Sequence, residues 1–202
     1  MAAPRRKLRT ERRRKSFLIL VEGAVTEEAY FLFWKRRLRE KSLVDIHEFH
    51  GTPKSLVEKA IEIKKFEEKE DRRGRGRMRD EYWCVFDVDT HPFLHEAMDL
   101  AQSQGVKTAV SNPCIELWLL LHFREQTAFI ETPEAVRLVK HETGGGKGKS
   151  LTLSTLELLG DRFDCARERA VRLDEKHHGD GTSAPGNPSS GVWKLVDSIM
   201  GV

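Results

Sequence analysis

Two acidic residues separated by one apolar residue end the apolar run Val85-Phe86-Asp87-Val88-Asp89. The run has the composition of a buried strand, and alternate side chains of a strand lie on one face. Asp87 and Asp89 should therefore point the same way, and their negative charges should repel each other. A divalent cation between the two carboxylates would offset that repulsion. The alternative is that they cap the next helix or face solvent.

Two further polar residues follow apolar stretches of the same kind. Glu22 comes after the stretch SFLILV, and Asn112 closes a second apolar stretch. The carboxyl ends of parallel strands meet at one edge of a sheet, where the sites of such sheets lie. We therefore expect Glu22, Asp87 and Asp89 to form one site. Mg²⁺, or Mn²⁺ in its place, prefers oxygen ligands, and it would polarise a phosphoryl oxygen and activate a water there.

Glu116 is the one charged residue in the otherwise apolar stretch CIELWLLL. A buried charge costs several kcal/mol unless it is paired or bound to a metal, so Glu116 could belong to the same site. Equally, a glutamate in the first turn of a helix interacts favourably with the helix dipole. The sequence leaves both interpretations open. Asn112 likewise could cap this helix, act as a polar site residue, or do both.

Basic residues in two glycine-rich stretches could neutralise charge on a phosphate. Lys147 and Lys149 lie in TGGGKGKS, which departs from a phosphate-binding P-loop because Thr143 stands where glycine is required and no strand precedes it. We expect a loop whose lysines reach phosphates. Arg75 and Arg77 lie in RRGRGRMR, within a charged stretch, residues 67–81, that should form a solvated loop into which the preceding helix frays.

Apolar, strand-like segments alternate with segments of helical period along the first part of the chain. That alternation predicts an α/β fold with a mostly parallel sheet flanked by helices. Strands are expected at residues 16–21, 43–49, 82–88 and 106–110. Helices are expected after Thr26 as N-cap, from Pro53, over 92–104, after Pro113, and over 133–141, 153–159, 161–175 and 190–199. The chain then divides into a disordered basic arm (1–15), an α/β core (16–125) and a helical C-terminal extension packed on the core (126–202).

The charge of the chain is distributed unevenly. The net charge is +3, but residues 1–15 contain eight Lys and Arg and one Glu, so the arm carries +7 and the remainder −4. A cationic arm on an acidic body suggests contact with phosphates, a solubilising tail being the alternative. No apolar run approaches the roughly 20 residues of a membrane span. The three cysteines form no CxxC pair, which favours a reduced, cytoplasmic protein without a membrane partner.

Longer motifs resemble the RloB-like family, whose members are encoded alongside restriction or abortive-infection systems. EGAVTEEAYF at 22–31 resembles the family's EGxxTExxYF opening, and VFDVD resembles its central DxD strand. SNPCIELWLLLHF at 111–123 is similar to its SNPxxExWLLLHF signature, and NPSS at 187–190 to its NPST-like element. Glu28 stands where proline is usual, and Ser190 where threonine is usual. The resemblance implies a Toprim-like fold with a Mg²⁺ site formed by Glu22, Asp87 and Asp89.

Together these observations predict a Mg²⁺-dependent phosphodiesterase that acts on DNA or RNA in antiphage defence. Glu22 would position a general base or a metal, and Lys147, Lys149 or an arginine of the 72–79 loop would neutralise charge developing on phosphorus. A noncatalytic nucleic-acid-binding or regulatory partner of a defence ATPase is the alternative, since the resemblance implies an ABC-type ATPase as neighbour. A phosphotransfer enzyme acting on a small nucleotide is a third reading. The intact carboxylates favour an enzyme.

Overall fold

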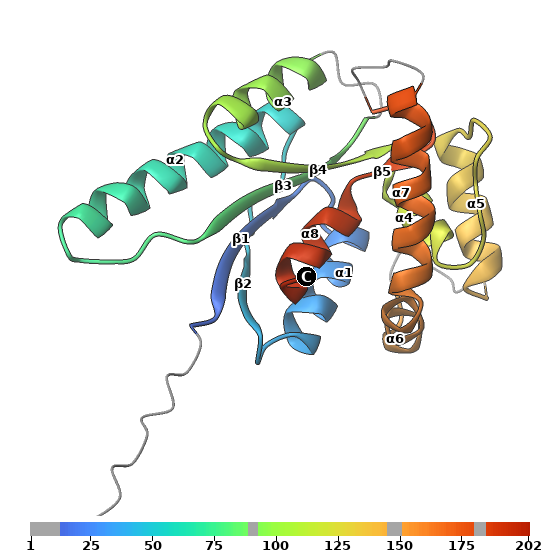
Figure 1. Ribbon diagram of the computed structural model, residues 1–202, viewed down its shortest axis with the longest axis horizontal. Coiled ribbons are helices and arrows are strands. Elements are labelled where there is room, and N and C mark those ends of the chain that lie inside the picture. Colours follow the sequence, from blue (N-terminus) through green and yellow to red (C-terminus); the bar gives the residue numbers. More distant parts are fainter. Residues whose placement is uncertain (1–12, 89–92, 145–150, 180–184) are drawn as a thin grey trace, which may run out of the picture.

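The chain forms one five-stranded sheet with the strand order β2-β1-β3-β4-β5 (Figure 1). The computed structural model describes residues 13–88, 93–144, 151–179 and 185–202. The strands β1 to β4 are parallel, and the short β5 pairs antiparallel with β4. Their bounds are β1 Lys15–Val21, β2 Ser42–Ile46, β3 Glu81–Asp87, β4 Lys107–Asn112 and β5 Ser189–Ser190. The predicted α/β class with a mostly parallel sheet is confirmed, whereas β5 was not predicted.

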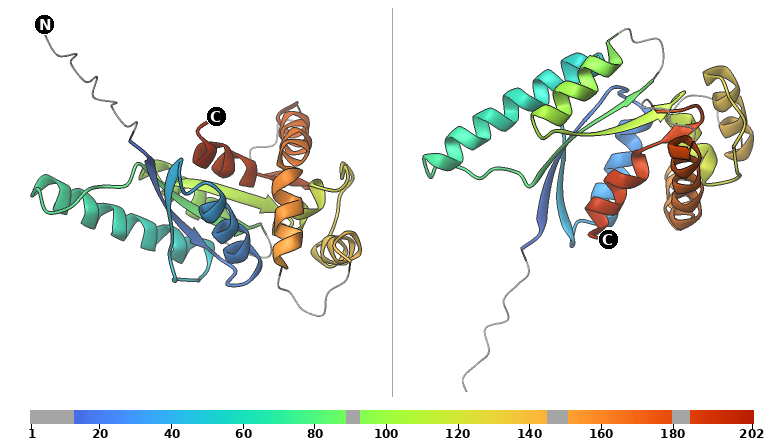
Figure 2. Two further views of the ribbon diagram at one scale, coloured as in Figure 1. Left: turned by 90° about the horizontal axis from the view of Figure 1, so that it is seen from below. Right: turned by 45° about the horizontal axis from the view of Figure 1, so that its top comes forward.

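Helices cover both faces of the sheet, which explains why the central strands β1 and β3 are apolar along most of their length (Figure 2). Phe17 and Ile19 of β1 pack on one face, and Leu18 and Leu20 pack on the other. The first face is covered by α1 (Thr26–Arg37), α4 (Ile115–Leu121) and α8 (Val192–Met200). The second face is covered by α2 (Pro53–Arg72) and α3 (Leu94–Ser103).

The remaining helices extend the first face. They are α5 (Thr132–Glu142), α6 (Leu153–Asp161) and α7 (Phe163–Gly179). Trp118 of α4, Leu159 of α6 and Leu173 of α7 belong to the same hydrophobic core as the sheet residue Val85. The C-terminal part of the chain also supplies β5 to the sheet and α8 to its face, so it shares the core of the N-terminal part. None of the described helices is long and apolar enough to cross a membrane.

The start of α1 and the end of α2 differ from the predictions. The N-cap of α1 is Val25, with no side-chain hydrogen bond, and Thr26 is the first residue of the helix. The helix α2 continues to Arg72 and does not fray at residue 67. Glu67 explains the extension, because its carboxylate accepts hydrogen bonds from the Tyr82 hydroxyl, at 2.6 Å, and from the Arg79 backbone N–H, at 3.1 Å. Contacts with β3 therefore hold the charged end of α2 in helical form.

Candidate functional site

Asp87 ends β3 on the face covered by α1 and α4. Trp83 and Val85, two and four residues earlier, belong to the core on that face, and strand alternation places Asp87 with them. The backbone N–H of Ile115, the first residue of α4, donates a hydrogen bond to the Asp87 carboxylate. The strand end and the helix start therefore meet at this carboxylate.

Glu22 follows β1, the strand that neighbours β3. Its backbone N–H donates to the Val85 carbonyl at 3.0 Å, which continues the pairing of the two strands by one residue. Its Oε2 accepts a hydrogen bond from the Asp87 backbone N–H at 3.2 Å. The structure thus brings Glu22 and Asp87 together at the carboxyl edge of the sheet, as expected for residues at the carboxyl ends of parallel strands.

Glu27 is a further carboxylate of this site, and it was not among the predicted site residues. It lies in the first turn of α1 and is only 7% exposed. Its carboxylate lies against Gly23, whose backbone N–H donates to it, and a Cβ atom at Gly23 would overlap the carboxylate. A signal was present, because Glu27 is the second glutamate of the EGxxTE stretch, five residues after Glu22.

Glu116 also lies within the electrostatic reach of these carboxylates. It is in the first turn of α4 and is partly buried. Its negative charge raises the pKa of both Asp87 and Glu27. Glu116 also forms a hydrogen bond with the buried Cys114 thiol, whose pKa is raised by burial and by the neighbouring carboxylates. The position at the start of the helix is therefore also a position beside the site.

Burial and mutual repulsion oppose full ionisation of the cluster. Burial is the main cause that raises the pKa of Asp87 well above its usual range, and Glu27, Glu116 and Glu22 add to it, while the Ile115 N–H opposes the shift. Burial likewise raises the pKa of Glu27 against the hydrogen bond from its own backbone N–H. Without a cation, the cluster therefore holds protons at pH values where an exposed carboxylate is ionised.

The donor set fits a hard divalent cation. All four groups offer carboxylate oxygens, and Mg²⁺ is commonly held by one or two carboxylates together with water and substrate phosphates. Within the described part of the chain, no three His, Cys, Asp or Glu side chains converge closely enough to hold one ion. Glu22 and Asp87 would be the two protein carboxylates of such a site, and the predicted third ligand, Asp89, lies outside the described residues.

A family model described as RloB-like protein matches residues 17–199, which is nearly the whole chain. The chain belongs to the RloB-like family. No curated protein and no solved structure shows significant similarity to it. The four carboxylates come from the three N-terminal stretches that resemble this family, namely EGAVTEEAYF, VFDVD and SNPCIELWLLLHF.

Asn112, in the last of these RloB-like stretches, ties the C-terminal segment to β4. Its amide donates to the Pro185 carbonyl at 2.7 Å, and its Oδ1 accepts from the Asn187 amide at 3.1 Å. The N-cap of α4 is Cys114, without a side-chain hydrogen bond, so the interpretation of Asn112 as that cap is wrong. The contacts that the structure shows for this side chain are structural ones, and its role toward a substrate stays a prediction.

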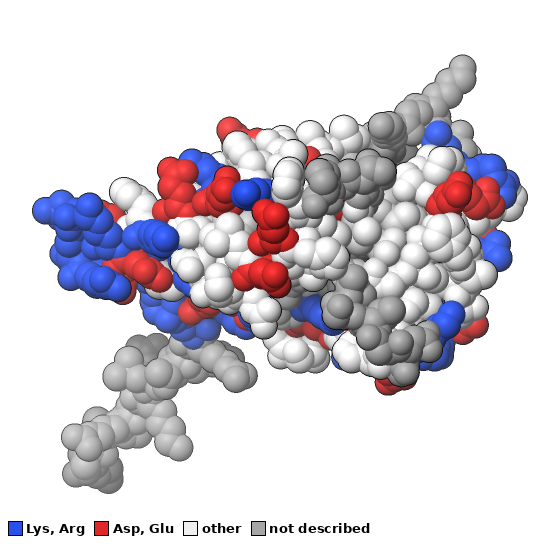
Figure 3. Space-filling model, turned by 90° about the horizontal axis from the view of Figure 1, so that it is seen from above, with Lys and Arg blue, Asp and Glu red and all other residues white. Residues whose placement is uncertain are grey.

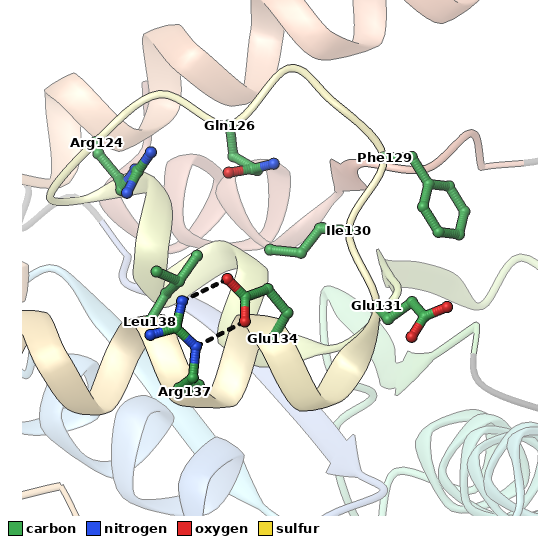
Figure 4. A pocket seen from close by; sticks show the side chains of 8 residues that line it. All are labelled: Arg124, Gln126, Phe129, Ile130, Glu131, Glu134, Arg137 and Leu138. Atoms are coloured by element: carbon green, nitrogen blue, oxygen red, sulfur yellow. Dashed lines mark hydrogen bonds and ion pairs between the residues drawn. The ribbon is translucent and has the colours of Figure 1, made fainter.

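Asn187, from the NPSS stretch, extends this connection to the segment between α4 and α5. It accepts a hydrogen bond from the Ile130 backbone N–H at 3.0 Å and donates to the Ile130 carbonyl at 2.9 Å. This segment borders a hollow of about 530 Å³ that the sequence did not reveal (Figure 4). Arg124, Phe129, Ile130 and the paired Glu134 and Arg137 are among its lining residues.

Two of the predicted basic residues, Arg75 and Arg77, do not lie at the carboxylates. Arg75 and Arg77 lie in the loop that joins the end of α2 to the start of β3, whereas Asp87 ends that strand. Seven residues of extended strand separate the two ends by roughly 20 Å. Within one chain, the two arginines therefore lie at the opposite edge of the sheet from the carboxylates. Lys147 and Lys149 lie outside the described residues.

Proposed function

We propose that this RloB-like protein is a metal-dependent phosphodiesterase that cleaves DNA or RNA in the cytoplasm, in antiphage defence. The observation that supports this proposal is the cluster of Glu22, Glu27, Asp87 and Glu116, in which burial and repulsion raise the pKa of two members. Such a cluster is costly unless a cation or a reaction uses it. We also propose that the sheet has the Toprim-like fold that the motifs imply.

In the proposed mechanism, Glu22, Asp87 and Asp89 would hold Mg²⁺ or Mn²⁺. The ion, when bound, would polarise a phosphoryl oxygen and favour the ionisation of a water. Glu27 would act as the general base, because its carboxylate lies against Gly23, the residue after Glu22, and burial raises its pKa. Glu116 would retain that proton within the site by raising the pKa of Glu27 further.

A second candidate is a noncatalytic nucleic-acid-binding or regulatory partner of an ABC-type defence ATPase. One observation favours it: the exposed arginines Arg75 and Arg77 lie at the edge of the sheet opposite to the carboxylates, so nucleic acid could bind without meeting the site. In that case the carboxylates would hold a structural cation.

The deciding experiment is the cleavage of end-labelled DNA and RNA, single- and double-stranded, with Mg²⁺ or Mn²⁺. We expect the wild type to cleave at least one of these substrates and Asp87→Ala to lose at least about 100-fold in rate, as expected when an interaction worth about 3 kcal/mol in the transition state is removed. Asp99→Ala, at an exposed site on α3, is the matched control and should keep wild-type activity. Equal cleavage by Asp87→Ala and wild type would contradict the proposal, and binding without cleavage would favour the second candidate.

A further inference from the structure

The end of α2 carries a group of exposed arginines that the proposed reaction does not use. Residues 72–77 read RRGRGR and contain no acidic and no apolar side chain. All four arginines are exposed, and basic side chains gather at this end of the molecule in Figure 3. We call Arg72, Arg73, Arg75 and Arg77 the basic tip.

Three guanidinium groups of the basic tip are available to a ligand. Arg73 pairs with Glu70 at 3.1 Å, but in the part of the chain that the structure describes no carboxylate lies within ion-pair distance of Arg72, Arg75 or Arg77. The nearby Asp80 lies within the electrostatic reach of Arg77, but its carboxylate pairs with Arg13 at 3.0 Å and accepts from Ser16. The dipole of α2 favours a positive charge at the C-terminus of the helix, but this effect fades within the last turn. It therefore accounts for the charge of Arg72 and not for Arg75 or Arg77.

The basic tip is remote from the carboxylate cluster. The segment before α2 lies at the cluster, because the His50 Nδ1 atom is 3.1 Å from the carbonyl oxygen of Val21, the residue before Glu22. From there α2 runs for 20 residues, which at 1.5 Å per residue is about 30 Å. The arginines are therefore separated from the proposed reaction by about the length of α2, and they cannot neutralise charge at the reacting phosphorus in the same chain.

We propose that the basic tip is an anchoring surface for the sugar–phosphate backbone of a nucleic acid, and that the carboxylate cluster acts on chains long enough to reach from one to the other. The second half of this inference rests on the proposed function. Arginine binds phosphate through two parallel N–H donors. A docking surface for a protein would need an apolar centre, which residues 72–77 lack.

The separation sets a minimum length for the substrate. One nucleotide of a duplex strand advances about 3.4 Å, so a nucleic acid must contain about 9 or more nucleotides to span 30 Å. A shorter oligonucleotide can occupy the basic tip or the carboxylates, but not both. Removal of the arginines should therefore slow the cleavage of the longer substrates only.

The binding test uses Arg72, Arg75 and Arg77 changed together to Gln. Fluorescence anisotropy with 30-nucleotide DNA and RNA, single- and double-stranded, measures the affinity over a range of salt concentrations. We expect the slope of log K against log salt to fall by about 2 to 3, since each phosphate contact contributes about 0.9, and the affinity near 0.1 M salt to fall by roughly 10- to 100-fold. The DNA and RNA arms show which of the two the surface prefers.

The matched control removes the same charge elsewhere. Arg36, Arg124 and Lys140 are exposed and lie outside the basic tip, so their joint change to Gln should leave the salt slope within about one unit of the wild type. All three proteins should show the same Tm, because the substituted side chains are exposed. An unchanged slope in the basic-tip variant, or an equal loss in both variants, would overturn the anchoring surface.

The cleavage test varies substrate length from 4 to about 30 nucleotides. For the wild type, we expect kcat/KM to be higher for substrates longer than about 9 nucleotides than for shorter ones. For the basic-tip variant, we expect kcat/KM of the long substrates to equal that of the short ones. Equal length dependence in both proteins would overturn the spanning inference. If neither protein cleaves any substrate, the proposed function fails, while the binding test still decides whether the basic tip binds nucleic acid.

Discussion

Asp87 is a carboxyl group that is both buried and surrounded by other carboxylates, so its ionised form is unfavourable without a cation. Its place at the end of a buried strand removes it from water, and the neighbouring carboxylates raise its pKa further. An acid with a raised folded-state pKa binds a proton on folding, so the free energy of unfolding falls as the pH rises from the unfolded pKa through the folded one. A bound cation would remove this penalty.

The change Asp87→Asn tests this residue. At pH 8 without metal, we expect Tm to rise, because the variant no longer ionises a buried group whose pKa is raised by burial. Addition of Mg²⁺ or Mn²⁺ should raise Tm of the wild type but not that of the variant. Thermal unfolding with and without metal measures both effects, with Asp99→Asn as control. Equal metal-induced shifts in Asp87→Asn and wild type would contradict the site.

Two roles of Glu116 predict opposite effects of Glu116→Gln on stability without metal. If Glu116 only complements the dipole of α4, Glu116→Gln should cost about 0.3–1 kcal/mol and leave activity intact. Because its charge raises the pKa of Asp87 and Glu27, we expect the other outcome. Stability without metal should hold or rise, while metal affinity and turnover fall by about 10-fold or more. Calorimetric titration with Mn²⁺ and urea unfolding distinguish the two.

At the scale of elements, Glu81 joins the amino ends of three elements at the edge of the sheet opposite to the site. It lies at the start of β3, and it forms ion pairs with Lys15 of β1 at 2.5 Å and with Lys107 of β4 at 2.8 Å. It also accepts a hydrogen bond from Ser198 of α8 at 2.9 Å. Burial opposes ionisation of Glu81, but these partners outweigh it and lower its pKa to about 2.

This network predicts a pH-dependent stability. A carboxylate whose pKa is about 4.5 in the unfolded chain and about 2 in the folded protein stabilises the fold above pH 4.5, and this contribution is lost as the pH falls from 4.5 to 2. We expect Glu81→Gln to cost about 3 kcal/mol at pH 7 and much less near pH 3. Urea unfolding at both pH values measures it, with exposed Glu157→Gln as control. A cost that does not shrink at pH 3 would contradict the network.

Asn187 connects elements that are distant in sequence. Its amide bonds both backbone groups of Ile130 and the side chain of Asn112. We expect Asn187→Ala to cost about 1–3 kcal/mol, because buried backbone groups lose their partners, and to speed hydrogen exchange at Ile130. Gln126→Ala removes a single hydrogen bond to Ala128 in the same segment and should cost less than about 0.5 kcal/mol. Equal costs would show that the connection is not specific to Asn187.

At the scale of the whole molecule, charge is segregated along the strands. The carboxylate cluster lies at the carboxyl edge of the sheet, while the basic tip lies at the amino edge, where the arm also joins β1. Arg13 and Lys15 are tied to Asp80 and Glu81, so a deletion of the arm that keeps these ion pairs must end before Arg13.

Deletion of residues 1–12 therefore tests the arm while it keeps the ion pairs of Arg13 and Lys15. It removes five Lys and Arg and one Glu. We expect an unchanged Tm, weaker binding to all nucleic acids and a salt slope lower by up to about 4 to 5. Any base preference should persist, because phosphate contacts carry no sequence information. An unchanged salt slope would assign the arm to solubility alone.

The sequence by itself determined the local features. Continuous apolar runs marked β1 and β3, which are buried on both faces of the sheet, and Glu22 and Asp87 at the ends of those runs marked the site. Proline and helical periodicity located the starts of α2 and α5 to within a residue or two. The two-residue β5 escaped prediction, since Ser189 and Ser190 have no apolar pattern and become a strand only by pairing with β4.

Only the tertiary structure decided which charges meet. The sequence gives no distance between elements, so Glu27 and Glu116 joined the cluster only when α1 and α4 packed on the same face of the sheet as Asp87. The same packing ties Asn112 to the C-terminal segment, and it places Arg75 and Arg77 at the far end of α2. Side-chain chemistry is encoded residue by residue, whereas pKa values and shared sites depend on burial and on separations in space, which arise only when the elements pack.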